Sequence, residues 1–558
     1  MRITERRRLG YLYLREAWRR ISRKIAVGHV SAFRFSGGTL ARLIVAPTDL
    51  RATDTFVAEE ILQGRFPLAG RVVECGDSSP FSQELPTRLF AVRLHAFGWL
   101  RHIRAAKTDA ACAHARAVVD DWISRHGSRI HGIAWEPDVI AQRVIAWLSH
   151  SPVVLQDSEN GFYRRFLKSL SLQVRYLRHV SAYAPDGLPR FRVRIALAMA
   201  SVSMSTSATT IRRAARDLDF EIERQILGDG THASRNPQAS VELLFDLLPL
   251  RQTYINLGHD VPSKLIPAID RMYPALRFFR HQNGDLALFN GATSTLANEL
   301  MAVLRYDESA GQPFKSLPHG RYHRLSQGNT VVIMDTGSAP SVDMSRTHHA
   351  GCLAFELSSG RNHFIINSGV PRYAGEKLRQ MSRATAAHST VTLGDTSICR
   401  ISQSGFLGPV LASPPFEVTD AREVLPDGCD ALRARHEGYV KQFGLIHERE
   451  LRLAPYGKKI LGRDLLLKAS GQALDGPPPV EAVARFHVHP AIVLEQFDRH
   501  KVRMMATDGE SWDFSVSGGT LDIEEDVFFA DVAGVRASEQ IAVRFSGPEI
   551  RWSLIHHA

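Results

Sequence analysis

Hydrophobic residues in the first half of the chain recur at helical spacing. In the segment DVIAQRVIAWLSH, Ile140, Val144 and Trp147 fall on one face, and Phe162 and Phe166 begin a similar series. Spacing of three and four residues predicts amphipathic helices. Loops with turn chemistry, such as AYAPDGLPRF and GDGTHASRNP, separate these stretches. Many helix pairs joined by short loops indicate a bundle or a toroid.

The pattern changes near GQPFKSLP, residues 311–318. Short runs with strand character follow, bounded by Gly, Pro, Asn and Asp, among them TVVIMD, HFIIN, KVRMMAT and IRWSLI. Strands at this density predict an antiparallel β-sandwich or barrel. Because 558 residues exceed what one hydrophobic core usually serves, we expect two domains, a helical one over residues 1–315 and a β domain over 316–558.

The first thirty residues predict a basic amphipathic helix. Its cations are Arg6, Arg7, Arg8, Arg15, Arg19, Arg20, Arg23 and Lys24, and they are interleaved with Leu9, Tyr11, Leu12, Leu14, Trp18 and Ile21. Two interpretations are open: a surface helix that docks on its own domain, or peripheral contact with anionic lipid. The segment lacks the apolar region of a secretory signal, and no run of about 18 apolar residues occurs. We therefore expect a cytoplasmic protein without a transmembrane segment.

The net charge of +11 favours an anionic partner, which could be an acidic glycan, a nucleic acid or a membrane surface. No standard nucleic-acid-binding module is visible, so we expect no nucleic-acid partner. The sequence also lacks a phosphate-binding loop, a dinucleotide fingerprint and the common hydrolase motifs. The five scattered cysteines show no metal-ligand spacing and indicate no disulfide framework.

Three segments concentrate residues that could carry chemistry. The first is QILGDGTHASRNP, residues 225–237, with His232, Arg235 and Asn236. It also fits a plain connecting loop in which Asn236 caps the next helix. The second segment lies around the predicted strands near residues 347–392 and contributes His348, His349, Tyr373, Arg383 and His388. The third segment, RFHVHP, places His487 and His489 on the same face of one strand, which fits a metal or anion site or a plain solvated sheet face. We expect the first two segments to converge on one concave surface between the domains.

These blocks resemble the heparinase II/III family. LHAFGWLRHI, WEPDVIAQRVIAWL, QILGDGTHASRNP, HHAGCLAFELSSG and RATAAHSTV follow one another in the order that the family shows. The resemblance implies an (α/α) toroid packed on an antiparallel β-sandwich, with a cleft for an acidic polysaccharide between them. It also implies a lyase that cleaves a uronate-containing chain, such as a glycosaminoglycan, by β-elimination. In that reaction hydrogen-bond donors neutralise the uronate carboxylate while Tyr or His moves the protons.

The sequence departs from the family at three places. Residues 187–190 read Gly-Leu-Pro-Arg, where the family's Gly-Asn-His-Leu supplies the neutralising Asn, and residues 236–240 lack the usual catalytic Tyr. His349 and His388 match the zinc ligands of metal-binding members, but Asn367 replaces the intervening Asp. An uncharged amide is a poorer zinc ligand than a carboxylate. We therefore expect that no cofactor is required, and that His349 and His388 would be the ligands if the sandwich held a structural zinc.

Three interpretations of function remain open. In the first, the protein is a lyase with a rebuilt site in which Tyr373, His349, His388 and Arg383 are catalytic. The substrate-binding residues would then be Arg190, His232, Arg235, Asn236 and His348. In the second, the fold is kept as a glycan-binding or scaffolding module without elimination chemistry. In the third, the cleft acts on another intracellular anionic saccharide, linked to a nucleotide or a lipid.

Overall fold

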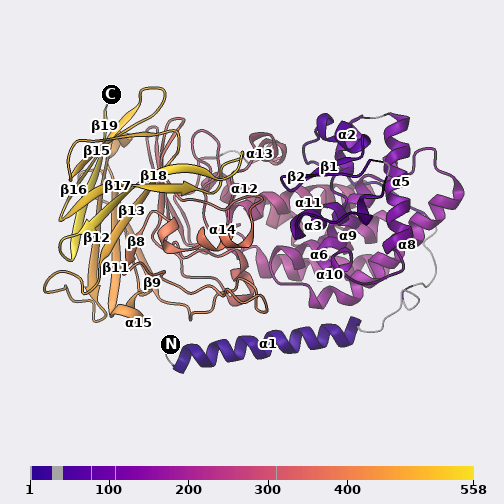
Figure 1. Ribbon diagram of the computed structural model, residues 1–558, viewed down its shortest axis with the longest axis horizontal. Helices are drawn as coiled ribbons and strands as arrows, with labels where there is room; N and C mark the ends of the chain where they lie inside the picture. The colour runs from indigo at the N-terminus through magenta and orange to yellow at the C-terminus, as the bar shows by residue number, and fades with distance from the viewer. Residues whose placement is uncertain are drawn as a thin grey trace.

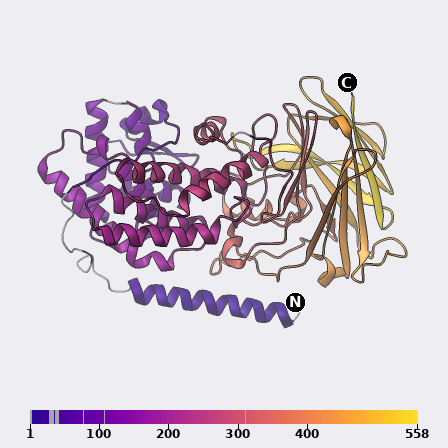
Figure 2. The same cartoon turned by 180° about the vertical axis from the view of Figure 1, so that it is seen from behind.

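A helical domain and a β-sandwich domain lie side by side along the long axis of the molecule (Figure 1). The computed structural model describes residues 3–27, 35, 42–76, 78–106, 108–309 and 311–557. Helix α1 (Ile3–Val27) runs beneath both domains, as the view from behind also shows (Figure 2). The predicted fold class, a toroid of helices followed by an antiparallel sandwich, is confirmed.

The two helices predicted from apolar spacing after the first thirty residues are present as α6 (Pro137–Ser149) and α8 (Asn160–Val180). Ile140, Val144 and Trp147 are buried together on α6, and Asn236 caps α11 with Pro237 at its first position, where the missing N–H costs nothing. After α1 the helices are α2 (Thr55–Leu62), α3 (Arg88–Ala96), α4 (Leu100–Ala106), α5 (Asp109–His126), α6 (Pro137–Ser149), α7 (Ser151–Val154), α8 (Asn160–Val180), α9 (Leu188–Ser203), α10 (Ala208–Gln225), α11 (Pro237–Asn256), α12 (Leu265–Phe278) and α13 (Ala297–Leu304).

A short antiparallel hairpin, β1 (Arg65–Leu68) and β2 (Arg71–Glu74), interrupts the helices. The sequence pattern did not predict it, because the strands have only four residues each and β2 is largely exposed. The hairpin turn contains Ala69 and Gly70, both with positive φ.

The second domain consists of two antiparallel sheets. One has the order β14-β15-β16-β19-β12-β11-β10-β9 and the other β17-β18-β13-β7-β6-β5-β4-β3, with β8 also paired to β13. The strands are β3 (Ser316–Leu317), β4 (Tyr322–Gln327), β5 (Thr330–Asp335), β6 (Phe355–Ser359), β7 (Asn362–Ile366), β8 (Val391–Leu393), β9 (Val418–Val424), β10 (Asp430–His436), β11 (Leu445–Leu453), β12 (Lys459–Lys468), β13 (Ala482–Val488), β14 (Val493–Gln496), β15 (Lys501–Met505), β16 (Ser511–Ser517), β17 (Gly519–Phe528), β18 (Arg536–Phe545) and β19 (Glu549–His557). Two short helices, α14 (Glu376–Met381) and α15 (Val440–Phe443), lie between strands.

The hydrophobic cores do not follow the change from helices to strands. One core fills the space between the sheets, whereas the core of the helical domain also takes in side chains of the first strands, namely Leu317, Tyr322, Val331 and Ile333. The β3–β5 end of one sheet therefore packs against the helical domain. Within the described part of the chain, no helix is long and apolar enough to cross a bilayer.

Candidate functional site

Arg235 is the centre of a buried polar network between the domains. Its side chain donates to the Asp335 carboxylate and to four backbone carbonyl oxygens, those of Gly320, Arg321, Gly337 and Ser338. A guanidinium has five N–H groups, so all of them are engaged. Burial beside Asp335 leaves Arg235 only 5% exposed. The structure thus corrects the prediction that Arg235 binds substrate, because it has no donor left to offer.

Asn290 continues this network into the sandwich. Its amide nitrogen donates to the Tyr322 hydroxyl at 2.7 Å and to Asp335 at 3.0 Å. Its oxygen accepts from Nδ1 of His348 at 2.9 Å and from the backbone N–H of His349 at 3.3 Å. Sequence reasoning missed Asn290; the one available signal was the turn dipeptide Asn-Gly at 290–291.

His349 and His388 hydrogen-bond to each other inside the sandwich. Nδ1 of His388 lies 2.8 Å from the Ala384 carbonyl oxygen, which can only accept, so this nitrogen carries the proton. Burial lowers the pKa of His388 to about 4 and that of His349 well below its usual value, so both rings are neutral. Nε2 of His388 then accepts from Nδ1 of His349 at 3.0 Å. Nε2 of His349 remains as a buried lone pair without a partner among the described residues.

The residues around this pair do not fit a standard zinc site. Asn367, at the position of the usual aspartate, donates to Glu356 at 3.1 Å and accepts from the backbone N–H of Ser389 at 3.2 Å. Structural zinc takes four ligands, most often His or anionic Cys and Asp. In the described ranges, no group of three His, Cys, Asp or Glu side chains could hold a metal. The two imidazoles hydrogen-bond to each other instead.

The polar groups of three further residues predicted to bind substrate contact neighbouring residues of the protein. His232 is buried and bonds to Gln225 at 2.8 Å and to Ser234 at 2.7 Å. Asn236 caps α11, as its alternative interpretation held. Arg190 forms an ion pair with Asp186 at 2.7 Å and donates to backbone carbonyl oxygens nearby. The substrate-binding role predicted for these residues therefore does not match their contacts.

Tyr373 and Arg383 are not fully engaged by contacts within the described part of the protein. Tyr373 is 46% exposed, and its ring packs against the turn of the β1–β2 hairpin, where a Cβ on Gly70 would lie 3.0 Å from it. Arg383 is buried, and its Nη1 has no hydrogen-bond partner among the described residues. Burial lowers the pKa of Arg383 to about 10, while Glu376 opposes the shift. Arg383 also contributes to the lowered pKa of His349, which places the cation near the imidazole pair.

A pocket of about 420 Å³ opens between the domains next to the network. It is lined from the helical side by Arg224, Leu227 and Ala233, and from the sandwich by His319, Arg321 and Met344. Arg224 is paired with Asp186 and Arg321 with Asp420. The pocket therefore carries less free positive charge than its arginines suggest.

Comparisons with known proteins match this architecture. The family model of the heparinase II/III-like C-terminal domain matches residues 309–553. FtsZ-localized protein C of Caulobacter vibrioides is 30% identical over 561 aligned positions, which cover 96% of each chain. The chain belongs to the heparinase II/III family. Heparinase III superposes with a TM-score of 0.71 at 14% identity over 93% of this chain and 86% of that one. Heparan sulfate lyase HepC from Pedobacter heparinus gives 0.60 at 16%, over 97% and 88%. At such low identity these two structures show the fold alone.

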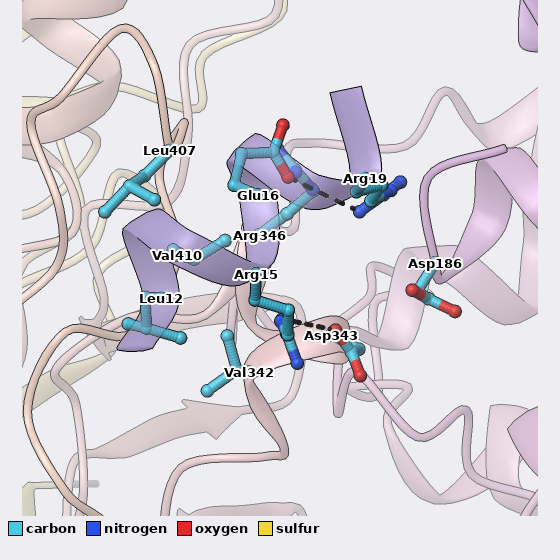
Figure 3. Close-up of a pocket in the computed structure, with 10 residues that line it drawn as sticks. All are labelled: Leu12, Arg15, Glu16, Arg19, Asp186, Val342, Asp343, Arg346, Leu407 and Val410. Carbon is cyan, nitrogen blue, oxygen red and sulfur yellow. Dashed lines mark hydrogen bonds and ion pairs between the residues drawn. The ribbon is translucent and has the colours of Figure 1, made fainter. Parts of the chain in front are cut away.

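In this heparinase II/III-family chain, the inner face of α1 is docked across the domain interface (Figure 3). Leu12 is buried with Leu407 and Val410 of the sandwich. Arg15 pairs with Asp343 at 2.7 Å, and Arg20 donates to the Phe406 carbonyl oxygen. Asp186 of the helical domain and Arg346 of the sandwich line the same small pocket under α1. The helix is therefore docked, as one interpretation predicted, but mainly on the sandwich and not on its own helical domain.

The outer face of α1 is apolar and uncovered. Tyr11, Leu14, Trp18, Ile21 and Ile25 are spaced by three and four residues, which places them on one stripe of a helix. Their exposed fractions are 62%, 74%, 72%, 51% and 74%. Soluble proteins rarely leave such a continuous apolar stripe in water unless it meets another surface. We name these five residues the outer stripe.

Proposed function

We propose that this protein is a scaffold that attaches peripherally to a membrane containing anionic lipid and keeps the heparinase II/III fold as its body. The outer stripe of α1 carries this proposal. A helix that lies in a bilayer interface needs an apolar face towards the acyl chains and basic residues beside it. Arg7, Arg23 and Lys24 are exposed on the same helix. The inner face stays docked, so the membrane would hold the whole molecule and not a loose arm.

The relative supports a location beside FtsZ. FtsZ-localized protein C is, by its name, localized with FtsZ, and it aligns with this chain over nearly its full length. We therefore propose FtsZ localization for this chain as well, together with the cytoplasmic location expected from its sequence. Cell imaging of a fluorescent fusion beside labelled FtsZ tests both statements, and a diffuse signal that ignores FtsZ would contradict the first.

Co-sedimentation with lipid vesicles tests the membrane contact. Trp18→Glu and Leu14→Glu each remove a side chain whose burial is worth roughly 1.5–3 kcal/mol, so each should weaken vesicle binding about tenfold or more. Phe56→Glu is the matched control, because Phe56 is 64% exposed on α2, at the edge of the molecule away from α1 (Figure 1). Equal loss of binding in all three variants, or no binding by the unmodified protein, would refute the proposal.

A lyase that acts on an acidic polysaccharide is the second candidate, and a specific observation favours it. Nε2 of His349 is an acceptor, Nη1 of Arg383 is a cationic donor, and both are buried without partners in the described part of the chain. Such unmatched groups cost free energy unless a ligand or water satisfies them. A uronate could meet Arg383 through its carboxylate and His349 through a hydroxyl group, with the exposed Tyr373 as acid and base. The same pair could instead hold a lipid-linked or nucleotide-linked acidic saccharide.

An ultraviolet assay separates the two candidates. Elimination leaves an unsaturated ring, so heparan, alginate, hyaluronan or pectin would gain absorbance near the ultraviolet edge. Activity that Tyr373→Phe abolishes without loss of glycan binding would support the lyase. No absorbance gain with any of these polymers, while vesicle binding persists, would leave the scaffold as the function.

A further inference from the structure

The outer face of α10 carries arginines that have no acidic partner. Arg212, Arg213 and Arg216 are exposed, and none of them forms an ion pair with any described residue. Phe220 continues the same face one turn further and is 66% exposed. The opposite face, with Leu218 and Ile222, is buried in the helical domain. This face therefore combines free positive charge with an exposed aromatic ring.

Acidic side chains of α10 do not neutralise these arginines, because they are engaged elsewhere. Asp217 pairs with Arg194 at 3.1 Å. Asp219 accepts from the backbone N–H groups at the start of α12, including that of Ser263 at 2.9 Å. Glu223 pairs with Lys264 at 2.5 Å. The local field around Arg212, Arg213 and Arg216 thus stays positive.

A fourth arginine extends the surface onto α8. Arg178 is exposed. Burial of part of its side chain and the charges of Arg213 and Arg175 lower its pKa, while the charge of Asp217 opposes the shift. Close like charges disfavour each other, so a cluster of this kind is relieved by an anion that binds across it. We name Arg178, Arg212, Arg213 and Arg216 the arginine surface.

The arginine surface adjoins α1. Burial raises the pKa of the Tyr176 phenol on α8, and the charge of Arg23 on α1 opposes this shift. Tyr176 is two residues before Arg178, so the end of α1 lies close to this part of α8. Figure 1 draws α10 on the lower side of the helical domain, the side on which α1 lies. The end of the outer stripe, Ile21 and Ile25, belongs to this end of α1. Apolar anchors and a cationic surface therefore lie on one side of the molecule.

We infer that the arginine surface binds the headgroups of anionic lipids and forms, with α1, one extended membrane-contacting side. This inference rests on the proposed membrane attachment and adds the lipid class and a second contact on the helical domain. Lipid is favoured over other polyanions because exposed apolar side chains, Phe220 and the end of the outer stripe, flank the cations. Bilayers offer an acyl region for such side chains and a negative surface for the arginines.

Flotation with two kinds of vesicle tests the inference. One kind contains phosphatidylcholine alone, and the other adds about one third phosphatidylserine. The test variant is Arg213→Glu with Arg216→Glu. The control is Arg71→Glu with Arg305→Glu, which changes the net charge equally at two exposed arginines, one on β2 and one beside α13. Figure 1 draws both elements in the upper half of the molecule, away from α1.

Each arginine near an anionic surface strengthens binding about fivefold, so the test variant should bind phosphatidylserine vesicles at least about 25-fold more weakly than the control. Binding to phosphatidylcholine alone, which depends on the outer stripe, should not differ between them. Equal binding of test and control to phosphatidylserine vesicles would overturn the inference and leave attachment by α1 intact. A defect confined to nucleic acid or an acidic peptide, with normal vesicle binding, would also overturn it. No vesicle binding by the unmodified protein would instead refute the proposed function itself.

Discussion

Replacing Arg235 with Met should destabilise the protein severely without touching its membrane contact. The substitution leaves the Asp335 carboxylate, which is 2% exposed, without its cationic partner, and it leaves four backbone carbonyl oxygens without their donor. Removing one partner of a buried ion pair costs about 3–5 kcal/mol, because the remaining charge stays in a medium that solvates it poorly. We therefore expect the free energy of unfolding to fall by about 4 kcal/mol. Arg235→Lys keeps the charge but has too few donors for all five bonds, so it should lie between Met and the native residue.

A double substitution makes this reasoning testable. Asp335→Asn removes the unpaired buried charge, so Arg235→Met with Asp335→Asn should be about 1–2 kcal/mol more stable than Arg235→Met alone. Urea unfolding followed by circular dichroism measures all three variants. If Arg235→Met unfolds at the urea concentration of the unmodified protein, the guanidinium is not a structural tie. It would then be free to bind a ligand, as the sequence first suggested.

Three other outcomes are expected. The pKa of His388 is about 4 in the folded protein and about 6.5 in the unfolded chain, so the unfolded chain takes up a proton first as the pH falls. The free energy of unfolding should therefore be fully retained above pH 6.5 and should fall by roughly 3 kcal/mol as the pH drops towards 4. Between these pH values, unfolding of His388→Gln should take up about one proton fewer than unfolding of the native protein, and an equal pH dependence of the two proteins would contradict the assignment. Elemental analysis of protein purified without added metal should find little zinc, given Asn367, and one zinc per chain would refute this. Leu12→Asp buries a charge under α1 and should raise hydrogen exchange around Leu407 and Val410; unchanged exchange would mean that this contact does not hold the helix.

The fold could be predicted because local patterns and the final packing agree. The run TVVIMD is the strand Thr330–Asp335, since a short, mainly apolar run bounded by turn residues has few other solutions. Strand β9 was missed because its exposed, charged residues resemble a loop. The β1–β2 hairpin was missed for the same reason, as a short element whose partner, and not its own pattern, stabilises it.

The candidate site could be predicted only in outline. The sequence pointed to the loop of Arg235 and to the segment of His349, and the network through Asp335 and Asn290 does connect them. The sequence could not show that every N–H group of Arg235 donates within that network. Asp335 is 100 residues further along the chain, and the accepting carbonyl oxygens belong to backbone turns. Nor could the sequence show which face of α1 meets the protein, since both faces carry apolar side chains.

The helices serve the sandwich as a covering layer. Leu317, Tyr322, Val331 and Ile333 belong to the sheet by hydrogen bonding but to the helical core by packing. A fragment cut at the change from helices to strands would present these side chains to water and would tend to associate through them. We therefore expect the helical domain and the sandwich to fold and to remain soluble only together.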